Sequence, residues 1–229
     1  VRITDNKILR FGQGDLQLHH NTVDSKIHNF TGDLTIANFA DNKDIIFQSD
    51  DGSGGVETYF FLDGSASSGS PQTVFPDNAY AAFGTGLDLH IHHNGTNSVI
   101  QNEVGSLQIV NRADDQDILF QCDDGSGGLE TYFFLDGSTG YTQFPDEKRL
   151  VFGSSNDLNI YHDGSDSYIT QGGTGHLYLR QTTDDKDIVF QCDNGSGGNA
   201  NYFRLDGSAA GSGGSGNLFT IFPDNSYIG

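Results

Sequence analysis

Residues 157–169 read DLNIYHDGSDSYI, and this stretch decides the fold of the chain. Apolar or histidine side chains occupy every second position from Leu158 to His162, with polar or tyrosine side chains between them. Side chains of a β-strand point alternately to opposite faces, so this period of two predicts a strand with one apolar face. The Asp-Gly pair at 163–164 is typical of a tight hairpin turn. The stretch therefore predicts an antiparallel β-hairpin whose second strand runs around Ile169.

The same hairpin pattern occurs three times along the chain, as part of a tandem repeat. Its equivalents begin with DLQLHH at 15–20 and DLHIHH at 88–93. Each copy is followed by an Ile-x-Phe-Gln motif, a loop ending in Gly-Ser-Gly-Gly, a Tyr-Phe-x-Leu-Asp-Gly-Ser motif and a Phe-Pro-Asp motif. The aspartates that mark the period are 72, 69 and 78 residues apart, at Asp5, Asp77, Asp146 and Asp224. This internal period predicts tandem structural repeats of about 70 residues.

The repeat predicts the organisation of the chain. We expect the end of a preceding repeat at 1–4, repeat 1 at 5–76, repeat 2 at 77–145, repeat 3 at 146–223 and the start of a further repeat at 224–229. Both ends are cut in similar phase, so we expect the chain to be a piece of a longer array. The repeats differ in length mainly in one segment, as surface loops do. We name this segment the variable loop, and it comprises 66–74, 139–143 and 209–221.

The composition favours β-structure. The chain contains 31 Gly together with many Asp, Asn and Ser, and no stretch of even ten residues has a helical pattern. We predict an all-β fold with about seven short strands in each repeat, including strands around Ile36, Ile109 and Leu179. Because 34% hydrophobic residues is low for one compact core, we expect stacking or oligomerisation to complete the core. An elongated β-solenoid and an intertwined trimeric β-fibre have the same strand signals, so both architectures stay open.

The charge of the chain argues against several classes of partner. It has 31 acidic and 11 basic residues, for a formal net charge of −20. Such a field repels phosphate backbones and anionic lipids, so we expect neither nucleic-acid binding nor binding to a membrane surface. The longest apolar stretches, such as 79–83, are about a quarter of a membrane span, so we expect no membrane insertion.

One pattern resembles a known class of protein. The chain contains Phe-Gly-x-x-x-Asp-Leu-x-Ile-x-His-Asp/Asn-Gly-x-x-Ser-x-Ile followed by Gly-x-Leu-x-Ile, and this resembles modules in fibre-type structural proteins of marine tailed bacteriophages. The resemblance covers nearly the whole chain in three copies, with 157–169 the closest match. Repeat 1 departs from it, since Asn21, Thr22 and Val23 stand where the Asn/Asp-Gly turn belongs, and we expect a different hairpin there. The resemblance implies an elongated, trimeric, β-rich fibre segment in a virion appendage, outside the cell, that serves virion architecture or host attachment. It brings no catalytic residue with it.

Three histidines at one aligned position are candidate metal ligands. They follow the apolar face of the predicted strand, and they are His20, His93 and His162. In a trimer, imidazoles from three chains could converge on the axis and bind a transition metal. The alternative, which we favour, is a histidine at the edge of the core that is hydrogen-bonded to a turn carbonyl. His90 and His92 form a further His-x-His candidate that occurs in repeat 2 alone.

Paired carboxylates before each Gly-Ser-Gly-Gly loop are candidate calcium ligands. These residues are Asp50, Asp51, Asp123, Asp124 and Asp193. Adjacent carboxylates on a glycine-rich loop can supply the hard oxygen ligands that calcium prefers. The spacing lacks the alternating aspartates and the terminal glutamate of an EF-hand loop. We therefore favour the alternative that these side chains cap backbone N–H groups of a hairpin turn.

Signatures of enzymes are poor in this sequence. No Gly-x-Ser-x-Gly motif occurs, and most carboxylates lie at turn positions that recur three times. We expect a protein that is not an enzyme and that requires no cofactor, with calcium or a transition metal as the candidates named above. Cys122 and Cys192 align with Ser49 on the face of the Ile-x-Phe residues, and we expect them to be small buried fillers.

The leading hypothesis is a structural fibre segment of tandem β repeats, in an extracellular or virion appendage shaft with a role in host attachment. We expect it to self-associate as a homotrimer and to contact a host-surface glycan or receptor. The alternatives are a cellular extracellular adhesin or filament module stabilised by calcium, and the scaffold of a glycan-processing tailspike. In the Tyr-Phe-x-Leu strand we expect Phe60 and Leu62, with their equivalents, to point inward. Aromatic side chains expected to pack between chains, or to stack on sugars, are Tyr59, Phe61, Tyr132, Phe134 and Tyr202.

Overall fold

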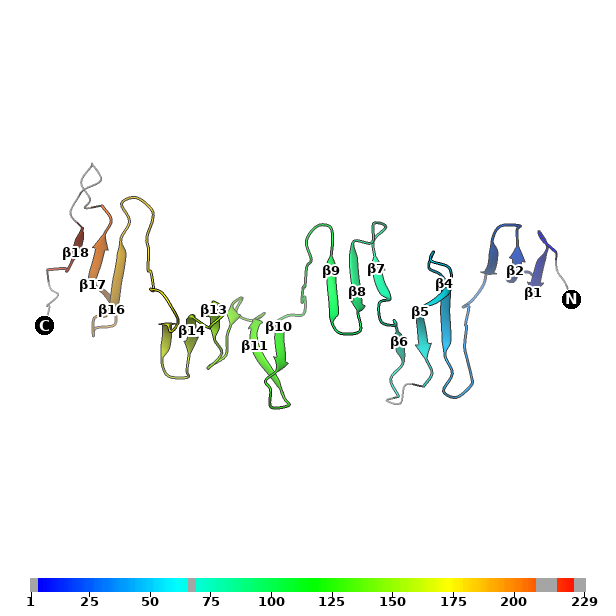
Figure 1. Cartoon of the computed structure of the whole chain (residues 1–229), viewed down its shortest axis with the longest axis horizontal. Helices are drawn as coiled ribbons and strands as arrows, with labels where there is room; N and C mark the ends of the chain where they lie inside the picture. The colour runs from blue at the N-terminus through cyan, green and yellow to red at the C-terminus, as the bar shows by residue number, and fades with distance from the viewer. Residues whose placement is uncertain (1–3, 66–68, 209–217, 225–229) are drawn as a thin grey trace. The chain divides into compact units, whose positions relative to one another are not determined.

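The computed structural model describes residues 4–65, 69–208 and 218–224. Within these residues the chain has eighteen β-strands and no helix, which confirms the all-β fold (Figure 1). Some predicted features lie outside the described residues. They are residues 1–3 of the predicted preceding repeat, residues 225–229 of the predicted further repeat, and residues 66–68 and 209–217 of the variable loop. The chain divides into two units, Val1–Ile109 with β1 to β9 and Val110–Gly229 with β10 to β18. In the described part, no helix is long and apolar enough to cross a membrane.

The strands form six antiparallel three-stranded sheets, and two kinds of sheet alternate along the chain. In each sheet the strands are neighbours in sequence and pair in order, as in a β-meander. The first kind, the histidine sheets, contains the predicted hairpin. These sheets are β1 (Ile8–Phe11), β2 (Leu16–His20) and β3 (Ser25–Asn29); β7 (Tyr80–Phe83), β8 (Leu89–His93) and β9 (Ser98–Asn102); and β13 (Leu150–Phe152), β14 (Leu158–His162) and β15 (Ser167–Gln171).

The second kind, the phenylalanine sheets, contains the Ile-x-Phe-Gln and Tyr-Phe-x-Leu motifs. These sheets are β4 (Ile45–Asp50), β5 (Val56–Asp63) and β6 (Gln72–Val74); β10 (Ile118–Asp123), β11 (Leu129–Leu135) and β12 (Thr142–Gln143); and β16 (Ile188–Asp193), β17 (Asn199–Asp206) and β18 (Phe219–Ile221). β-branched and aromatic residues are frequent in these strands, as their β-propensity predicts.

Each phenylalanine sheet has a bulge and a row of stacked rings. Phe47 pairs with Phe60, but the next residue, Gln48, pairs with Thr58, so Tyr59 is the extra residue of a β-bulge. The ring of Phe60 lies 4.5 Å from that of Phe47 and 5.7 Å from that of Phe75, measured between centroids. The same bulge and the same stack recur in the other two phenylalanine sheets. We name these rings the phenylalanine ladders, and they are Phe47, Phe60 and Phe75; Phe120, Phe133 and Phe144; and Phe190, Phe203 and Phe222.

Each histidine sheet has a row of aliphatic side chains across its three strands. Residues paired directly across an antiparallel sheet share a face, so their side chains contact one another. Ile160, for example, pairs with Leu150 on one side and with Ile169 on the other. We name these the aliphatic rows, and they are Leu9, Leu18 and Ile27; Ala81, Ile91 and Ile100; and Leu150, Ile160 and Ile169.

No apolar side chain is buried anywhere in the described residues. The expectation that Leu62 points inward is wrong, because Leu62 is 41% exposed while its neighbour Phe61 is half-buried. The chain exposes 18375 Å² of surface, whereas even two separate compact domains of half its mass expose about 12,000 Å² together. The reason is that a three-stranded sheet with no second layer leaves both of its faces open.

The predicted strands around Ile36, Ile109 and Leu179 are wrong as strands of this chain. Residues 34–36, 107–109 and 177–179 are irregular, and no backbone hydrogen bond joins them to another described residue. Their apolar side chains are also exposed to solvent, with Ile36 at 61% and Ile109 at 64%. A strand needs a neighbouring strand for its backbone groups, and the described residues supply none here.

The hairpin turn of repeat 1 has the same geometry as the other two, although its sequence differs. Thr22 has a φ angle of 78°, close to the 85° of Gly95 and the 92° of Gly164. The Asn21 side-chain oxygen accepts a hydrogen bond from the Asp24 backbone N–H at 2.7 Å, as equivalent side chains do in the other turns. The expectation of a different hairpin is therefore wrong, because this side-chain oxygen closes the turn without glycine.

Replacing Thr22 by glycine is expected to stabilise the protein by about 0.5–1 kcal/mol. A left-handed backbone is strained for a β-branched residue, whereas glycine adopts it without steric cost. Denaturant unfolding of Thr22→Gly measures the change. The matched control is Thr96→Gly, in the equivalent turn at a position without a positive φ. Equal effects of the two substitutions would contradict the strain at Thr22.

Candidate functional site

The three aligned histidines lie at the ends of β2, β8 and β14, each beside an aliphatic row. In each case the histidine Nδ1 lies 3.1 Å from a serine Oγ on the paired strand. The pairs are His20 with Ser25, His93 with Ser98, and His162 with Ser167. The partner is thus a serine hydroxyl, where we expected a turn carbonyl. The three histidines belong to three different sheets, so an axial metal site would need imidazoles from other copies of the chain.

The paired carboxylates make hydrogen bonds inside their own loops. Asp50 Oδ1 accepts the Gly52 backbone N–H at 2.6 Å, and Asp51 Oδ1 accepts both the N–H and the hydroxyl of Ser53, at 2.8 and 2.6 Å. Asp123 and Asp124 repeat these contacts in repeat 2. This is the geometry of the turn-capping alternative. Among the described residues, no three His, Cys, Asp or Glu side chains gather to hold a metal ion.

In repeat 3 the same loop is capped by one aspartate and one asparagine, where repeats 1 and 2 have two aspartates. Asp193 Oδ1 accepts the Gly195 N–H at 2.6 Å, and Asn194 Oδ1 accepts the Ser196 N–H at 2.8 Å. An amide oxygen therefore serves this turn as well as a carboxylate oxygen does. A calcium site at these loops stays a prediction, and its ligand set would be weaker by one carboxylate in repeat 3.

The hydrogen bonds shift the acidity of the capping carboxyl groups. The Ser53 hydroxyl, and next the Ser53 backbone N–H, lower the pKa of Asp51 below its usual value. The Ser126 hydroxyl and backbone N–H lower the pKa of Asp124 in the same way. A pKa that is lower in the folded state means that the ionised carboxylate stabilises the fold. That contribution is present above the unfolded pKa, near 4, and is lost as the pH falls through the folded value.

A second set of aspartates closes the phenylalanine sheets, and the sequence analysis missed it. Asp44 Oδ1 accepts the backbone N–H of Gly64 at 3.0 Å, twenty residues further along. The equivalent bonds join Asp117 to Gly137 and Asp187 to Gly207, also at 3.0 Å. A Cβ atom at any of these glycines would overlap the backbone of the residue before the aspartate. The strict recurrence of Leu-Asp-Gly-Ser was the signal that could have identified them.

The two cysteines are exposed, so the prediction that they are buried fillers is wrong. Cys122 does follow Ile118 and Phe120 at a spacing of two on β10, as expected. It is exposed because none of the residues that the structure describes covers that face. Both thiols are free.

Aromatic and histidine rings gather on the other face of the histidine sheets. Tyr80 lies across from His92, with ring centroids 4.2 Å apart, and 5.3 Å from His90. In repeat 3, Tyr161 stacks on Tyr168 at 4.9 Å, and the Arg149 guanidinium lies 4.2 Å from the Tyr161 centroid. The candidate His-x-His pair is therefore packed against a tyrosine ring in this structure.

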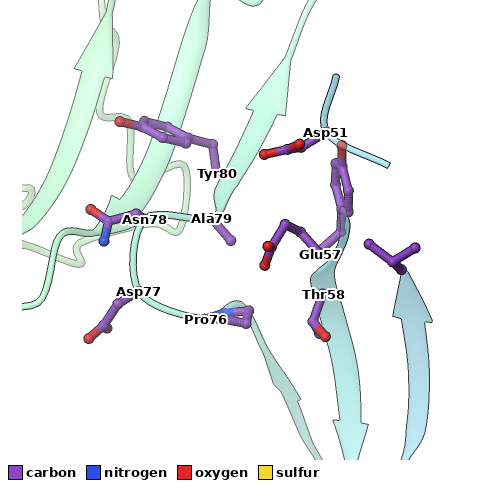
Figure 2. Close-up of a pocket in the computed structure, with 10 residues that line it drawn as sticks. Asp51, Glu57, Thr58, Pro76, Asp77, Asn78, Ala79 and Tyr80 are labelled. Atoms are coloured by element: carbon purple, nitrogen blue, oxygen red, sulfur yellow. The ribbon is translucent and has the colours of Figure 1, made fainter. Parts of the chain in front are cut away.

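An open pocket of about 500 Å³ lies beside the end of β5, and Figure 2 shows it. Asp51, residues 56–59 of β5 and residues 76–80 line it. β6 pairs only with residues 61–63, so the edge of β5 from Val56 to Tyr59 is open. The carboxylates of Asp51 and Glu57 point into the space between β5 and the 76–79 segment (Figure 2). The pocket is thus acidic on one side and carries two tyrosines, Tyr59 and Tyr80.

Comparison of the chain with protein families, with curated proteins and with solved structures finds no match.

Asparagine is expected to replace Asp51 with little loss of stability at pH 7, whereas alanine is expected to lower the melting temperature. Asn194 shows that an amide oxygen can cap the turn, and alanine has no acceptor. Thermal unfolding of the unchanged protein, Asp51→Asn and Asp51→Ala at pH 7 and pH 3 makes the comparison. The stability that the unchanged protein has over Asp51→Ala should shrink at pH 3, while the stability that Asp51→Asn has over Asp51→Ala should not. If asparagine and alanine were equally destabilising in calcium, but not in chelator, the carboxylate would be a calcium ligand instead.

A methyl group at Gly137 is expected to destabilise the protein by about 1–3 kcal/mol, the usual cost of forcing atoms into an occupied space. The added Cβ would overlap the Gln116 carbonyl and break the bond from the Gly137 N–H to Asp117. Denaturant unfolding of Gly137→Ala tests this expectation. Gly128→Ala is the matched control, because a Cβ there meets open space and the φ angle is not positive. If the two variants have the same free energy of unfolding, the hydrogen bond from Gly137 to Asp117 does not stabilise the sheet.

Proposed function

We propose that this chain is a structural segment of a fibre, assembled from several copies, with no enzymatic activity of its own. The fibre is the shaft of an extracellular or virion appendage and has a role in host attachment. One observation carries the proposal: every sheet presents an apolar face, and no apolar residue is buried in the described part of the chain. A protein built in this way requires a partner surface of the same apolar character, and copies of the chain supply it.

The amount of exposed surface supports self-association. The exposed area exceeds that of two separate compact domains by about 6,000 Å². Obligate interfaces between subunits bury about 2,000–5,000 Å² or more and are hydrophobic. Burial is worth about 25 cal/mol for each Å² of apolar surface, so covering the phenylalanine ladders and the aliphatic rows supplies the missing core.

The unpaired segments at 34–36, 107–109 and 177–179 give independent support. Each alternates apolar and other residues like a strand, yet none has a backbone partner among the described residues. Open backbone groups of this kind are a template for pairing with another chain. In an intertwined fibre, these segments pair with a neighbouring copy.

The number of copies and the biological setting come from the resemblance to modules of marine phage fibre proteins, which implies a trimer in a virion appendage. Three copies around one axis bring three equivalent faces together. The non-enzymatic role is supported by the use of the recurring carboxylates, since Asp44, Asp50, Asp51 and their equivalents hold backbone groups.

Native mass is the measurement that tests the assembly. We expect a trimer in native mass spectrometry and in sedimentation, with the same mass in the presence of chelator. A stable monomer would contradict the fibre. Dissociation by chelator would instead favour the calcium-stabilised adhesin or an axial metal at His20, His93 and His162.

A pair of substitutions on β15 tests which face is the interface. Ile169 lies in an aliphatic row and is 59% exposed, while Thr170 is its exposed neighbour on the opposite face. Each change to aspartate adds one negative charge to the same strand, so the two variants differ only in the face that carries the charge. We expect Ile169→Asp to dissociate the assembly and Thr170→Asp to leave the native mass unchanged. Retention of mass by Ile169→Asp would exclude this face from the interface.

A further inference from the structure

Repeat 2 contains a built-in counterpart of the pocket in Figure 2, and this counterpart is filled. Glu130 and Tyr132 on β11 are equivalent to Glu57 and Tyr59 on β5. Lys148 follows the Phe-Pro-Asp motif of repeat 2, at the position that Ala79 has after the motif of repeat 1. The two places share the glutamate and the tyrosine of the strand. They differ at four lining positions, where Val56, Asn78, Ala79 and Tyr80 of repeat 1 correspond to Leu129, Glu147, Lys148 and Arg149 of repeat 2.

In repeat 2 the ammonium group of Lys148 lies between a carboxylate and an aromatic ring. Its Nζ is 3.0 Å from Glu130 Oε1 and 5.9 Å from the centroid of the Tyr132 ring. The lysine side chain is 26% exposed, so most of it is covered. Ion pairing with a carboxylate and attraction to the face of a tyrosine ring both favour a primary ammonium at this point.

Repeat 1 has no lysine at this position, but it keeps the glutamate and the tyrosine that contact the lysine in repeat 2. Ala79 ends at Cβ, and the cavity of about 500 Å³ lies where a longer side chain would extend. The Glu57 carboxylate is exposed and has neither a hydrogen bond nor an ion pair within the described part of the chain. Asp51 adds a second carboxylate on the same side of the pocket, as Figure 2 shows.

We propose that this pocket binds a primary ammonium group on an alkyl stem, in the place that Lys148 fills in repeat 2. The stem lies along Ala79 and Pro76, and the ammonium meets Glu57 and the ring of Tyr59. The net charge of −20 favours a cation over a neutral ligand. Repeat 3 has Ala200 where the glutamate stands, so it lacks the carboxylate, and the described residues contain one such site.

The ammonium group could belong to a free alkylamine or to a lysine side chain of another protein, and two probes distinguish these ligands. n-Butylamine represents a free alkylamine, and lysine blocked at both its amino and carboxyl ends represents a side chain of another protein. Saturation-transfer NMR on the intact assembly measures the binding of each probe, with n-butanol as the uncharged control. We expect saturable binding of n-butylamine that weakens with added salt, and none of n-butanol. Blocked lysine that binds equally well identifies the site as one for lysine side chains, whereas binding of n-butylamine alone identifies it as one for free amines.

Three variants locate the site. Glu57→Gln is expected to weaken n-butylamine binding about fivefold, the upper end for an exposed ion pair. Ala79→Lys restores the internal lysine and is expected to abolish binding. Lys148→Ala opens the equivalent place in repeat 2 and is expected to add a second site, roughly doubling the signal at saturation. The proposal is overturned if n-butylamine shows no saturable binding, or if binding is the same in all three variants.

Native mass spectrometry of each variant separates this proposal from the proposed assembly. Glu57, Ala79 and Lys148 lie outside the phenylalanine ladders and the aliphatic rows, so we expect all three variants to keep the native mass. A fibre that assembles but binds no amine would overturn the amine site alone. A monomer that binds amines would overturn the fibre alone.

Discussion

A β-sheet of three strands has two faces and, among the residues described within each unit of this chain, no second layer buries either of them. This constraint explains most of what the structure contains. The phenylalanine ladders and the aliphatic rows recover part of the lost burial by contact between neighbouring strands, yet Leu62, Ile91 and Phe152 stay about half exposed. The exposure of Cys122 and Cys192 has the same origin. Burial of apolar side chains within the described residues therefore contributes little to stability, and in the proposed assembly we expect folding and association to be coupled.

Without a core, the geometry of each sheet depends on polar side chains in the turns. Asn21, Asn94 and Asp163 close the hairpins of the histidine sheets through the same backbone N–H. Asp51 and its equivalents close the glycine-rich loops, and Asp44 and its equivalents join the two ends of each phenylalanine hairpin. This use explains why aspartate is so frequent in a chain without an evident cluster of catalytic or metal-binding residues among those that the structure describes. Many of these carboxylates hold the backbone in place of a packed interior.

The sequence was sufficient to predict elements whose signal is local. The alternation from Leu158 to His162 and the Asp-Gly pair after it specify a hairpin by themselves, and the structure has it. Features that depend on pairing could not be read in this way. The extra residue at Tyr59 emerges only when β5 is aligned with β4, and the irregular state of 107–109 depends on the absence of a partner strand. The pocket was missed as well, because it depends on β6 ending before it reaches Tyr59 and on the side chain at 79.

The bond from the Gly64 N–H to Asp44 lies directly before the variable loop begins. Because the bond fixes the end of β5 against the start of β4, the length of the connection that follows does not alter the register of these two strands. From the residue after Leu-Asp-Gly-Ser to the residue before Phe-Pro, the loop has nine residues at 66–74, five at 139–143 and thirteen at 209–221. All three phenylalanine sheets nevertheless keep the same pairing of their first two strands. The last residues of the variable loop form β6, β12 or β18. Evolution, or a protein engineer, can therefore exchange the residues that precede this third strand while the pairing of the first two strands stays unchanged.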